Sequence, residues 1–365
     1  MSTSNSMNPS KLRKLLIDGE QTVGTYEPLT SFSYIVPVTT FPTLAIDRGK
    51  TMIDRTGLFD GQAGDVDSIR GSSAWSASFE MELHDSASKY NYWTLFMLAC
   101  GFELEEQTDT PGLGDTSTLF TLSNKVYANF NSAATDHPPI TLSATVVQNR
   151  NETDDYAMRM RGTTGVASFN LATGDIAKMS VASKGLVVNT AADADDFLDN
   201  SDDDVSALGT TGNWGTPFVV KNISLTILDE ALTPRTICLQ SITVNMNSNH
   251  PDFECPSEEY GFEISPVFHD TSPTVDLEFP DGSTVQPWVF AQFRSGAVFS
   301  LEAELVSGSG RNLKFTFPRL QFQTVTLGDS GGFVNYSVST KAVRDPGQPA
   351  SDLMEVLYTY LPATP

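Results

Sequence analysis

The sequence lacks most of the residues from which metal, redox and nucleotide sites are built. Its 365 residues contain three cysteines and four histidines, with no CxxC pair and no shared ligand spacing. An odd number of scattered cysteines argues against a disulfide framework and against a cysteine zinc site, and it fits a reducing cytoplasm. We expect no metal and no cofactor. The residues concerned are Cys100, Cys238 and Cys255, and His84, His137, His250 and His269.

Basic residues and long apolar runs are also scarce. There are 22 Lys and Arg against 45 Asp and Glu, which gives a formal net charge of -23. Such a balance disfavours tight binding to nucleic acid through its phosphates. No apolar run approaches the roughly 18 to 20 residues of a membrane span, and the N-terminus does not resemble a secretory signal. No P-loop or dinucleotide fingerprint occurs, so the sequence predicts neither a membrane protein nor an enzyme.

The best-defined pattern lies between Trp75 and Glu105. Phe79, Met81 and Leu83 alternate with polar residues that include Glu80 and Glu82, which predicts a strand with one buried face and one acidic, wet face. Apolar residues then recur at helical spacing from 93 to 100, and Gly101 suits the position just after a helix. A strand therefore leads into a short helix that should lie across the apolar side of the sheet.

The rest of the chain is rich in strand-like segments, and composition divides it into five parts. We predict an N-terminal arm over 1–28, with one possible helical turn at 12–17, and a first β domain over 29–190. A linker or loop over 191–216 carries seven aspartates between 193 and 204. A second β domain covers 217–345 and a C-terminal arm 346–365. The aspartate run lacks the glycine and spacing of an EF-hand calcium loop, so a solvated linker is the better interpretation.

The two β domains share an order of patterns that predicts an internal repeat. Residues 275–279 repeat the apolar and acidic order of 79–83, and each is followed by an aromatic helical segment that ends in glycine. Two strands joined by a turn come next in each half, over 156–188 and 312–344. The alternative is that any two β domains look alike at this level. The shared short helix within each β half favours duplication.

One short motif resembles a catalytic signature. Residues 328–332 read GDSGG, as around the nucleophile of trypsin-like serine proteases, which would make Ser330 the nucleophile. No histidine stands in a context that suits the base of such a triad, and Phe333 replaces the proline of that family. Five turn-forming residues between two strands are more simply a hairpin loop. A GDSGG-type hydrolase stays the alternative from the enzyme class.

Acidic pairs recur on the predicted wet faces. Each pair places two carboxylates side by side on one strand, and the ordinary interpretation is a solvated outer face. Recurrence in corresponding places of both halves argues for a shared purpose. The pairs are Glu80 and Glu82, Asp276 and Glu278, and Glu302 and Glu304.

These stretches resemble the major tail tube proteins of long-tailed, siphovirus-type bacteriophages. The similarity lies in WTLFMLACGFE (93–103), in MRGTTGVASFNLATGDIAKMSVASKGLV (160–187), and in the long loop 47–74 ahead of the acidic strand. It covers most of 30–190 and, through the repeat, more weakly 216–345. The resemblance implies two tandem β-sandwich or split-barrel domains, each with a short flanking helix, that join across subunits into a closed β-barrel ring. The implied function is a tail tube that carries genomic DNA into the host.

The resemblance also implies particular roles and partners. The three acidic pairs would line the channel, and loop 47–74 would contact the next ring. Its charged candidates are Asp47, Arg48, Lys50, Asp54, Arg55, Asp65, Asp67 and Arg70. With two tube domains per chain we expect three chains per pseudo-sixfold ring, helically stacked, with a six-chain ring as the alternative. Tape measure, tail terminator and distal tail proteins would be partners in the virion tail, and assembly would take place in the bacterial cytoplasm. Another virion component, such as a decoration or baseplate protein, or a host-binding β-sandwich module, is the alternative.

Overall fold

The structure is a computed structural model, and it describes eighteen segments of the chain. These are residues 13–20, 34–39, 43–47, 74–86, 90–107, 116–122, 141–149, 155–187, 198–199, 214–227, 234–235, 240–246, 252–254, 262–264, 273–280, 286–330, 333–345 and 353–360. Within them the protein is mainly β, as expected, with one large antiparallel sheet that is not closed. Neither described helix has the length and apolar character to cross a membrane.

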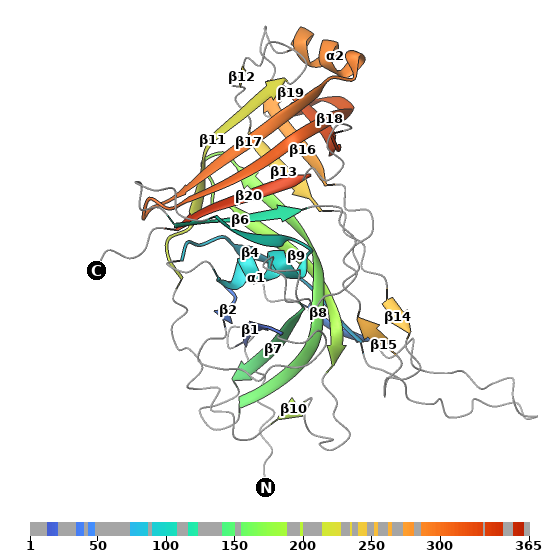
Figure 1. Cartoon of the computed structure of the whole chain (residues 1–365). Coiled ribbons are helices and arrows are strands. Elements are labelled where there is room, and N and C mark those ends of the chain that lie inside the picture. The colour runs from blue at the N-terminus through green and yellow to red at the C-terminus, as the bar shows by residue number, and fades with distance from the viewer. Residues whose placement is uncertain are drawn as a thin grey trace, which may run out of the picture.

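The elements follow one another along the chain as shown in Figure 1. They are β1 (Arg13–Gly19), β2 (Tyr34–Ile35), β3 (Thr43–Asp47), β4 (Ala74–Glu82), α1 (Tyr92–Ala99), β5 (Glu103–Gln107), β6 (Thr116–Leu122), β7 (Leu142–Asn149), β8 (Asp155–Ala172), β9 (Lys178–Val187), β10 (Leu198–Asp199), β11 (Phe218–Ile227), β12 (Pro234–Arg235), β13 (Ser241–Asn245), β14 (Asp252–Glu254), β15 (Phe262–Ile264), β16 (Thr274–Pro280), α2 (Gln286–Ser295), β17 (Val298–Ser307), β18 (Asn312–Ser330), β19 (Phe333–Ala342) and β20 (Met354–Tyr360).

The same order of paired strands occurs twice. In the first half β1, β7, β8, β9, β4 and β3 pair in that order, each antiparallel to the next. In the second half β11, β17, β18, β19, β16 and β13 do the same. Each half also has its helix between corresponding strands, α1 after β4 and α2 after β16. The predicted repeat of strand, helix and hairpin is therefore confirmed as a repeat of topology.

The longest strand of each half bends at a corresponding place. Strand β8 pairs with β7 over its first part and with β9 over its second, with an irregularity around Gly162, whose φ is 61°. Strand β18 likewise pairs with β17 over its first part and with β19 over its second. Pro318 and Arg319 have no partner in the β17–β18 register, which marks the irregularity. Glycine at positive φ and proline at a bulge both allow a strand to bend at a point where its regular hydrogen bonding to a neighbour is interrupted. Each long strand thereby changes its pairing partner part-way along its length.

A continuous first layer runs across both halves. Its strand order is β3-β4-β9-β8-β13-β16-β19-β18, and the joint between the halves is the antiparallel pairing of β8 with β13. Because β3 corresponds to β13 and β8 to β18, this layer is one four-stranded unit used twice, head to tail. The halves are thus neighbours in a single sheet.

A second layer covers the apolar side of the first. Its order is β5-β6-β20-β18-β17-β11, which Figure 1 shows side by side. The two layers meet where Phe169 of β8 and Phe315 of β18 pack edge to face, with ring centroids 5.1 Å apart. Residues on alternate positions of both layers fill this core with aromatic and aliphatic side chains.

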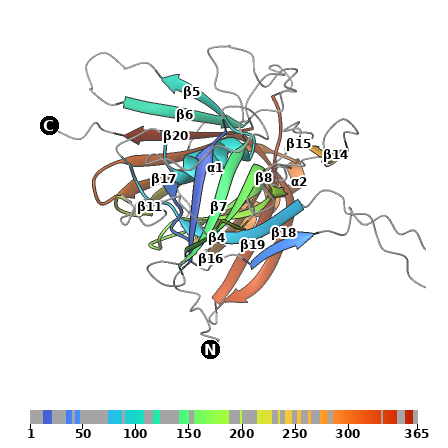
Figure 2. The same cartoon turned by 90° about the horizontal axis from the view of Figure 1, so that it is seen from below.

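Helix α1 lies inside this core, between the layers (Figure 2). All eight of its residues are buried. Asn91 caps its start through a capping box with Thr94, and Gly101 follows its end with a φ of 101°, as the sequence indicated. Trp93 packs against Tyr358 of β20 and Phe120 of β6, while Phe96 packs against Phe79 of β4. The helix therefore ties the second layer to the first.

Both predicted arms contain strands instead. The helical turn expected at 12–17 is wrong: residues 13–19 form β1, with Leu15, Leu16 and Ile17 buried and the strand paired to β7. In the C-terminal arm Leu353, Met354, Leu357 and Tyr360 stand at near-helical spacing, but 354–360 form β20 between β6 and β18. In the predicted linker, residues 198–199 form β10 on the edge of β8. Apolar residues at mixed spacing fit either structure, and pairing with distant strands decides it.

Candidate functional site: an acidic sheet face

The outward side of the first layer brings two of the predicted acidic pairs onto one surface. Directly opposed residues in an antiparallel pair point to the same face, so the register traces that face across the sheet. One row runs through six strands from Glu82 to Asp276 and beyond. It consists of Glu82, Lys178, Asn170, Thr243, Asp276 and Ser339. We call this surface the acidic face.

The neighbouring row completes the pairs. It starts at Glu80 and passes through Ser180, Ser168, Asn245, Thr274 and Lys341. Glu278 lies two residues beyond Asp276 on β16, on the same side. Every traced position is half-buried or exposed, whereas the residues between them in each strand are buried. The sequence prediction of an acidic outer face holds for both halves, and the joint of β8 with β13 unites the two.

The carboxylates of the first half have close polar partners. The Lys178 ammonium lies 3.2 Å from Glu80 Oε1, and the Thr39 hydroxyl donates to the same oxygen at 3.0 Å. His84 Nε2 lies 3.1 Å from Glu82 Oε2. Both glutamate side chains are about one-third exposed, at 34% and 33%. Solvent screens such contacts, so they orient the carboxylates more than they stabilise the fold.

The carboxylates of the second half contact only uncharged groups in the described part of the chain. Asn245 Nδ2 donates to Asp276 Oδ2 and the Ser241 hydroxyl to Glu278 Oε2, each at 3.2 Å. Glu278 is exposed. Lys341 stands diagonally across from Asp276 on the same face, but the described hydrogen bonds of both carboxylates come from uncharged groups.

The third predicted pair lies on the other side of the molecule. Glu302 and Glu304 stand on β17, opposite Thr316 and Lys314 of β18, on the outward side of the second layer. The Lys314 ammonium lies 2.9 Å from Glu302 Oε1. Because the two layers face each other through the core, these residues cannot share a surface with Glu80 and Asp276 within one chain. Within one chain they therefore form a second acidic surface, separate from the acidic face.

A hollow of about 620 Å³ opens at the middle of the first layer. Its lining comes from five consecutive strands, β4, β9, β8, β13 and β16, and it includes Ser78, Ser168, Ser180, Asn245 and Thr274. The hollow therefore spans the joint between the halves, and its lining combines small polar side chains with apolar ones such as Phe79, Val181 and Met246. No described group of histidine, cysteine, aspartate and glutamate in the chain is arranged to hold a metal ion.

The other predicted site residues fall largely outside the described residues. Asp47 ends β3 opposite Ala74 of β4, so the loop 47–74 leaves and re-enters the sheet at adjacent positions. Arg48, Lys50, Asp54, Arg55, Asp65, Asp67 and Arg70 lie outside the described part. Ser330 is the last residue of β18 and pairs with Phe333 of β19, so residues 328–330 of the GDSGG motif lie in a strand, and residues 331–332 fall outside the described part. Of the histidines, only His84 is described, and its ring contacts Glu82 and the Gly215 carbonyl.

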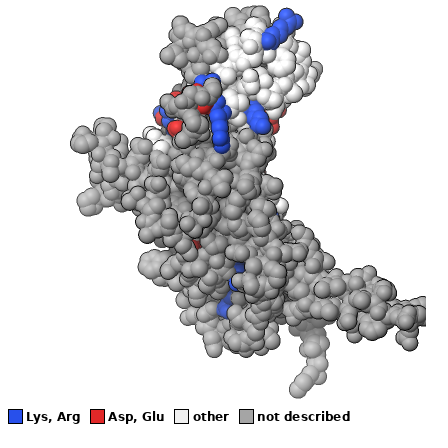
Figure 3. Space-filling model, turned by 45° about the vertical axis from the view of Figure 1, so that its right-hand side comes forward, with Lys and Arg blue, Asp and Glu red and all other residues white. Residues whose placement is uncertain are grey.

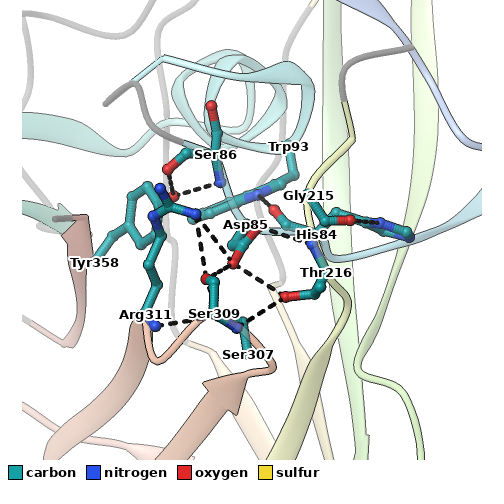
Figure 4. A network of polar contacts seen from close by, with 10 residues as sticks. All are labelled: His84, Asp85, Ser86, Trp93, Gly215, Thr216, Ser307, Ser309, Arg311 and Tyr358. Atoms are coloured by element: carbon teal, nitrogen blue, oxygen red, sulfur yellow. Dashed lines mark hydrogen bonds and ion pairs between the residues drawn. The ribbon is translucent and has the colours of Figure 1, made fainter. Parts of the chain in front are cut away.

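Sequence reasoning missed a buried polar network centred on Asp85 (Figure 4). The Asp85 side chain, 1% exposed, accepts hydrogen bonds from the Thr216 amide at 2.8 Å and from the Ser309 hydroxyl. Arg311 Nη1 lies 3.3 Å from its Oδ2. A Cβ on Gly215 would stand 1.6 Å from Asp85 Oδ1, so only glycine fits there. The network joins the β4–α1 connection to two segments of the second half.

Environment sets the pKa of Asp85. Burial alone would raise it, but hydrogen bonds from Ser309, Ser307 and Thr216, together with the charge of Arg311, outweigh burial and hold the pKa below its usual value. Its contacts come from residues 131 and 224 positions away, so no local pattern in the sequence could announce them. We assign the network a structural role, because its central carboxylate is buried and its described partners all belong to the chain itself.

Figure 3 shows the end of the molecule that carries α2, where described atoms are mainly uncharged and Lys and Arg side chains stand apart from one another. No protein-family model matches the chain, and no curated protein gives a significant match. The fold and the surface define a mainly antiparallel β protein with a repeated topology and an acidic face that extends across the repeat.

Proposed function

We propose that this chain is a structural virion subunit that polymerises into stacked rings and forms the tail tube of a long-tailed bacteriophage. One observation carries the proposal: four carboxylates from two repeated units lie on one face of one continuous layer. A surface built in this way is extended by repetition. A pocket enzyme or a monomeric binding module has no need for such a layer.

The acidic face suits the lining of a channel for DNA. Duplex DNA carries one negative charge per about 1.7 Å of its axis, so a wall of carboxylates repels it and prevents sticking. At physiological salt the screening length is about 8 Å, so charges on the wall act only on DNA close to it. Asp276 and Glu278, whose described hydrogen-bond partners are uncharged, contribute most to this repulsion.

Two tube units in each chain favour three chains in each ring. A ring with pseudo-sixfold symmetry would then expose six copies of the acidic strand, from β4 and β16 in turn. Loop 47–74 is the proposed contact to the next ring, and the ring stack would meet tape measure, terminator and distal tail proteins. Assembly in the bacterial cytoplasm and residence in the virion tail follow from this proposal.

The test reverses charge on the acidic face and leaves the remaining surface intact. In Asp276→Lys/Glu278→Lys, the new lysines would have hydroxyl-bearing neighbours across the strands, because Ser241, Thr243, Ser337 and Ser339 stand opposite. We expect tubes by negative-stain electron microscopy at high protein concentration, as for the unmodified chain. These tubes should retain short duplex DNA that unmodified tubes release, and should protect it from nuclease.

The matched control is Glu302→Lys/Glu304→Lys, which makes the same charge change on the outward side of the second layer. DNA bound by that variant should be digested at the rate of free DNA, because it lies outside the tube. Dispersed monomers of the unmodified chain under all conditions would overturn the tube. If DNA bound by the two variants is digested at the same rate, the acidic face does not line the channel.

A further inference from the structure

Two strand edges of the first layer are open at opposite ends. Within the described residues, β3 and the neighbouring bridge at Val38 have β4 as their strand partner, and the C-terminal part of β18 has β19. The Val38 amide donates to the Val36 carbonyl at 2.9 Å and would have to exchange this bond for one to another strand. An open edge presents unpaired backbone groups that attract another strand. These two edges are the first and last strands of the repeated unit.

The chain itself contains a pattern for closing them. Strand β8 occupies in the first unit the place of β18 in the second, and β13 occupies the place of β3. In the middle of the layer β8 and β13 are paired, with Asn170 opposite Thr243 and Leu171 opposite Ile242. The open edges are therefore the two sides of a joint that the molecule already makes once.

Exposure differs between the two positions as such a joint requires. Leu171, on the core side of β8, is fully buried, with 0% exposure. Its counterpart by register is Leu327 of β18. Asn170 pairs with Lys178 of β9 as Thr326 pairs with Ser337 of β19, and Leu171 and Leu327 are the next residues along their strands. Leu327 is 51% exposed and belongs to the few large apolar side chains on the described surface. Strand β13 adjoins β8 at Leu171, whereas no described strand adjoins β18 on the corresponding side of Leu327.

We propose that the C-terminal part of β18 binds the β3 edge of a second copy of this chain, antiparallel and in the register of β8 with β13. Transferring that register sets Leu327 opposite Val38 of the next copy, and Thr326 opposite Thr39. The assignment follows from Met81 and Leu277, which occupy the same position in the two units and pair with Val38 and Ile242. This inference rests on the proposed ring and specifies its subunit contact.

The contact is heterologous, because two different edges meet. Head-to-tail contacts either close into a ring or continue as an open filament. Each chain would add eight strands to the first layer in the order already present, so the acidic face would continue from copy to copy. Antiparallel neighbours stand about 4.5 to 5.5 Å apart at Cα, within the range a disulfide can bridge.

Paired cysteines test the register. In Thr39→Cys/Thr326→Cys both substituted positions are exposed in the single chain. Oxidation of the assembled protein should give covalent dimers and trimers on a non-reducing gel. The corresponding pair inside one chain, Asn170→Cys/Thr243→Cys, is the positive control and should close without changing the mass. Each single-cysteine variant reports any bond to the native cysteines.

The outcome separates this contact from the tube proposal. If tubes form and the internal control closes while the Thr39/Thr326 pair stays monomeric, the contact is wrong and the tube stands. Cross-linked oligomers without tubes would support the contact between β18 and β3 and contradict the tube proposal. A pair that cross-links in unassembled, dilute protein as fast as in assemblies would also contradict the register, since random collision would then explain the bond.

A substitution on the open edge provides a second measurement. Leu327→Asp should abolish assembly in light scattering, because a carboxylate would be buried against Val38 of the next copy. Its melting temperature as a monomer should stay within about 2 °C of the unmodified chain, as expected for an exposed position. The control is Val219→Asp on β11, a residue 37% exposed that pairs with β17 in the second layer and belongs to neither open edge, and it should assemble normally. Normal assembly of Leu327→Asp would overturn the proposal.

Discussion

A single carboxylate, Asp85, fixes how the second half of the chain attaches to the first. Its side chain binds the Thr216 amide and hydroxyl and the Ser309 hydroxyl, and its backbone exchanges hydrogen bonds with Gly215 and Thr216. Removing one member of a buried ion pair leaves the other without compensation, which is more costly than the net value of the pair. Asp85 therefore has a far larger expected effect than the exposed carboxylates of the acidic face.

Stability should depend on pH through this residue. A folded-state pKa below the ordinary 3.8 means that Asp85 contributes stability above that pH and loses it as the pH falls through the lowered value. Asp85→Asn should reduce the free energy of unfolding by about 3 kcal/mol at pH 7. The gap between variant and unmodified chain should shrink in acid, as measured by urea unfolding at pH 7 and near pH 3.

The control for that measurement is Asp276→Asn, a half-exposed carboxylate with one amide contact. It should change the free energy of unfolding by less than about 0.5 kcal/mol at either pH. A pH-independent loss in Asp85→Asn would mean that packing, and not charge, accounts for the effect.

At the scale of single elements, β20 holds the second layer together. It fills the gap between β6 of the first half and β18 of the second, and its Tyr358 packs on Trp93 of α1. The Tyr358 hydroxyl also donates to the Ser86 carbonyl at 2.6 Å and accepts from the Ser86 amide at 2.8 Å. The last strand of the chain thus anchors the connection that carries Asp85.

Removing that hydroxyl isolates the contribution of the anchor. Tyr358→Phe keeps the ring against Trp93 and leaves a backbone donor and acceptor of Ser86 without this partner. We expect a loss of about 2 kcal/mol in the free energy of unfolding by urea. Tyr34→Phe is the matched control: its hydroxyl donates one bond, to the Tyr90 carbonyl, at 3.1 Å, and its loss should be about 1 kcal/mol or less. Equal losses of unfolding free energy in Tyr358→Phe and Tyr34→Phe would contradict the proposed anchoring role of the Tyr358 hydroxyl.

Local patterns predicted the elements whose structure is decided locally. The acidic strand β4, the capped helix α1 and the turns after β8 and β18 each have a clear period or turn composition. Strands β1 and β20 were missed because their apolar residues fit a helix as well, and only pairing with β7 or with β6 and β18 selects the strand. The bend at Gly162 likewise divides β8 into what look like two strands in sequence.

The candidate site was predictable in part for the same reason. Alternation identified Glu80, Glu82, Asp276 and Glu278 as outward-facing, but it could not tell which layer a strand joins. Glu302 and Glu304 have the same local pattern and lie on the opposite side, since β17 pairs with β11 and β18. The Asp85 network depends on segments brought together by the fold, and nothing in the residues around Asp85 identifies its partners.

For the whole molecule, the duplicated topology predicts how many chains form one ring. A layer made of two head-to-tail units in each chain supplies an even number of units to any closed ring, and three chains supply six. We expect class averages of rings viewed along the axis to show three equivalent chains with six similar but alternating lobes. The alternation arises because α1 is wholly buried whereas α2 exposes Phe293 and Arg294, so the two units differ in outline. Native mass spectrometry of isolated rings should give three times the 39.6 kDa chain mass. Six chains around the axis would contradict this prediction. The ring would then contain twelve repeated units, and the two units of one chain would not replace two separate subunits of a six-unit ring.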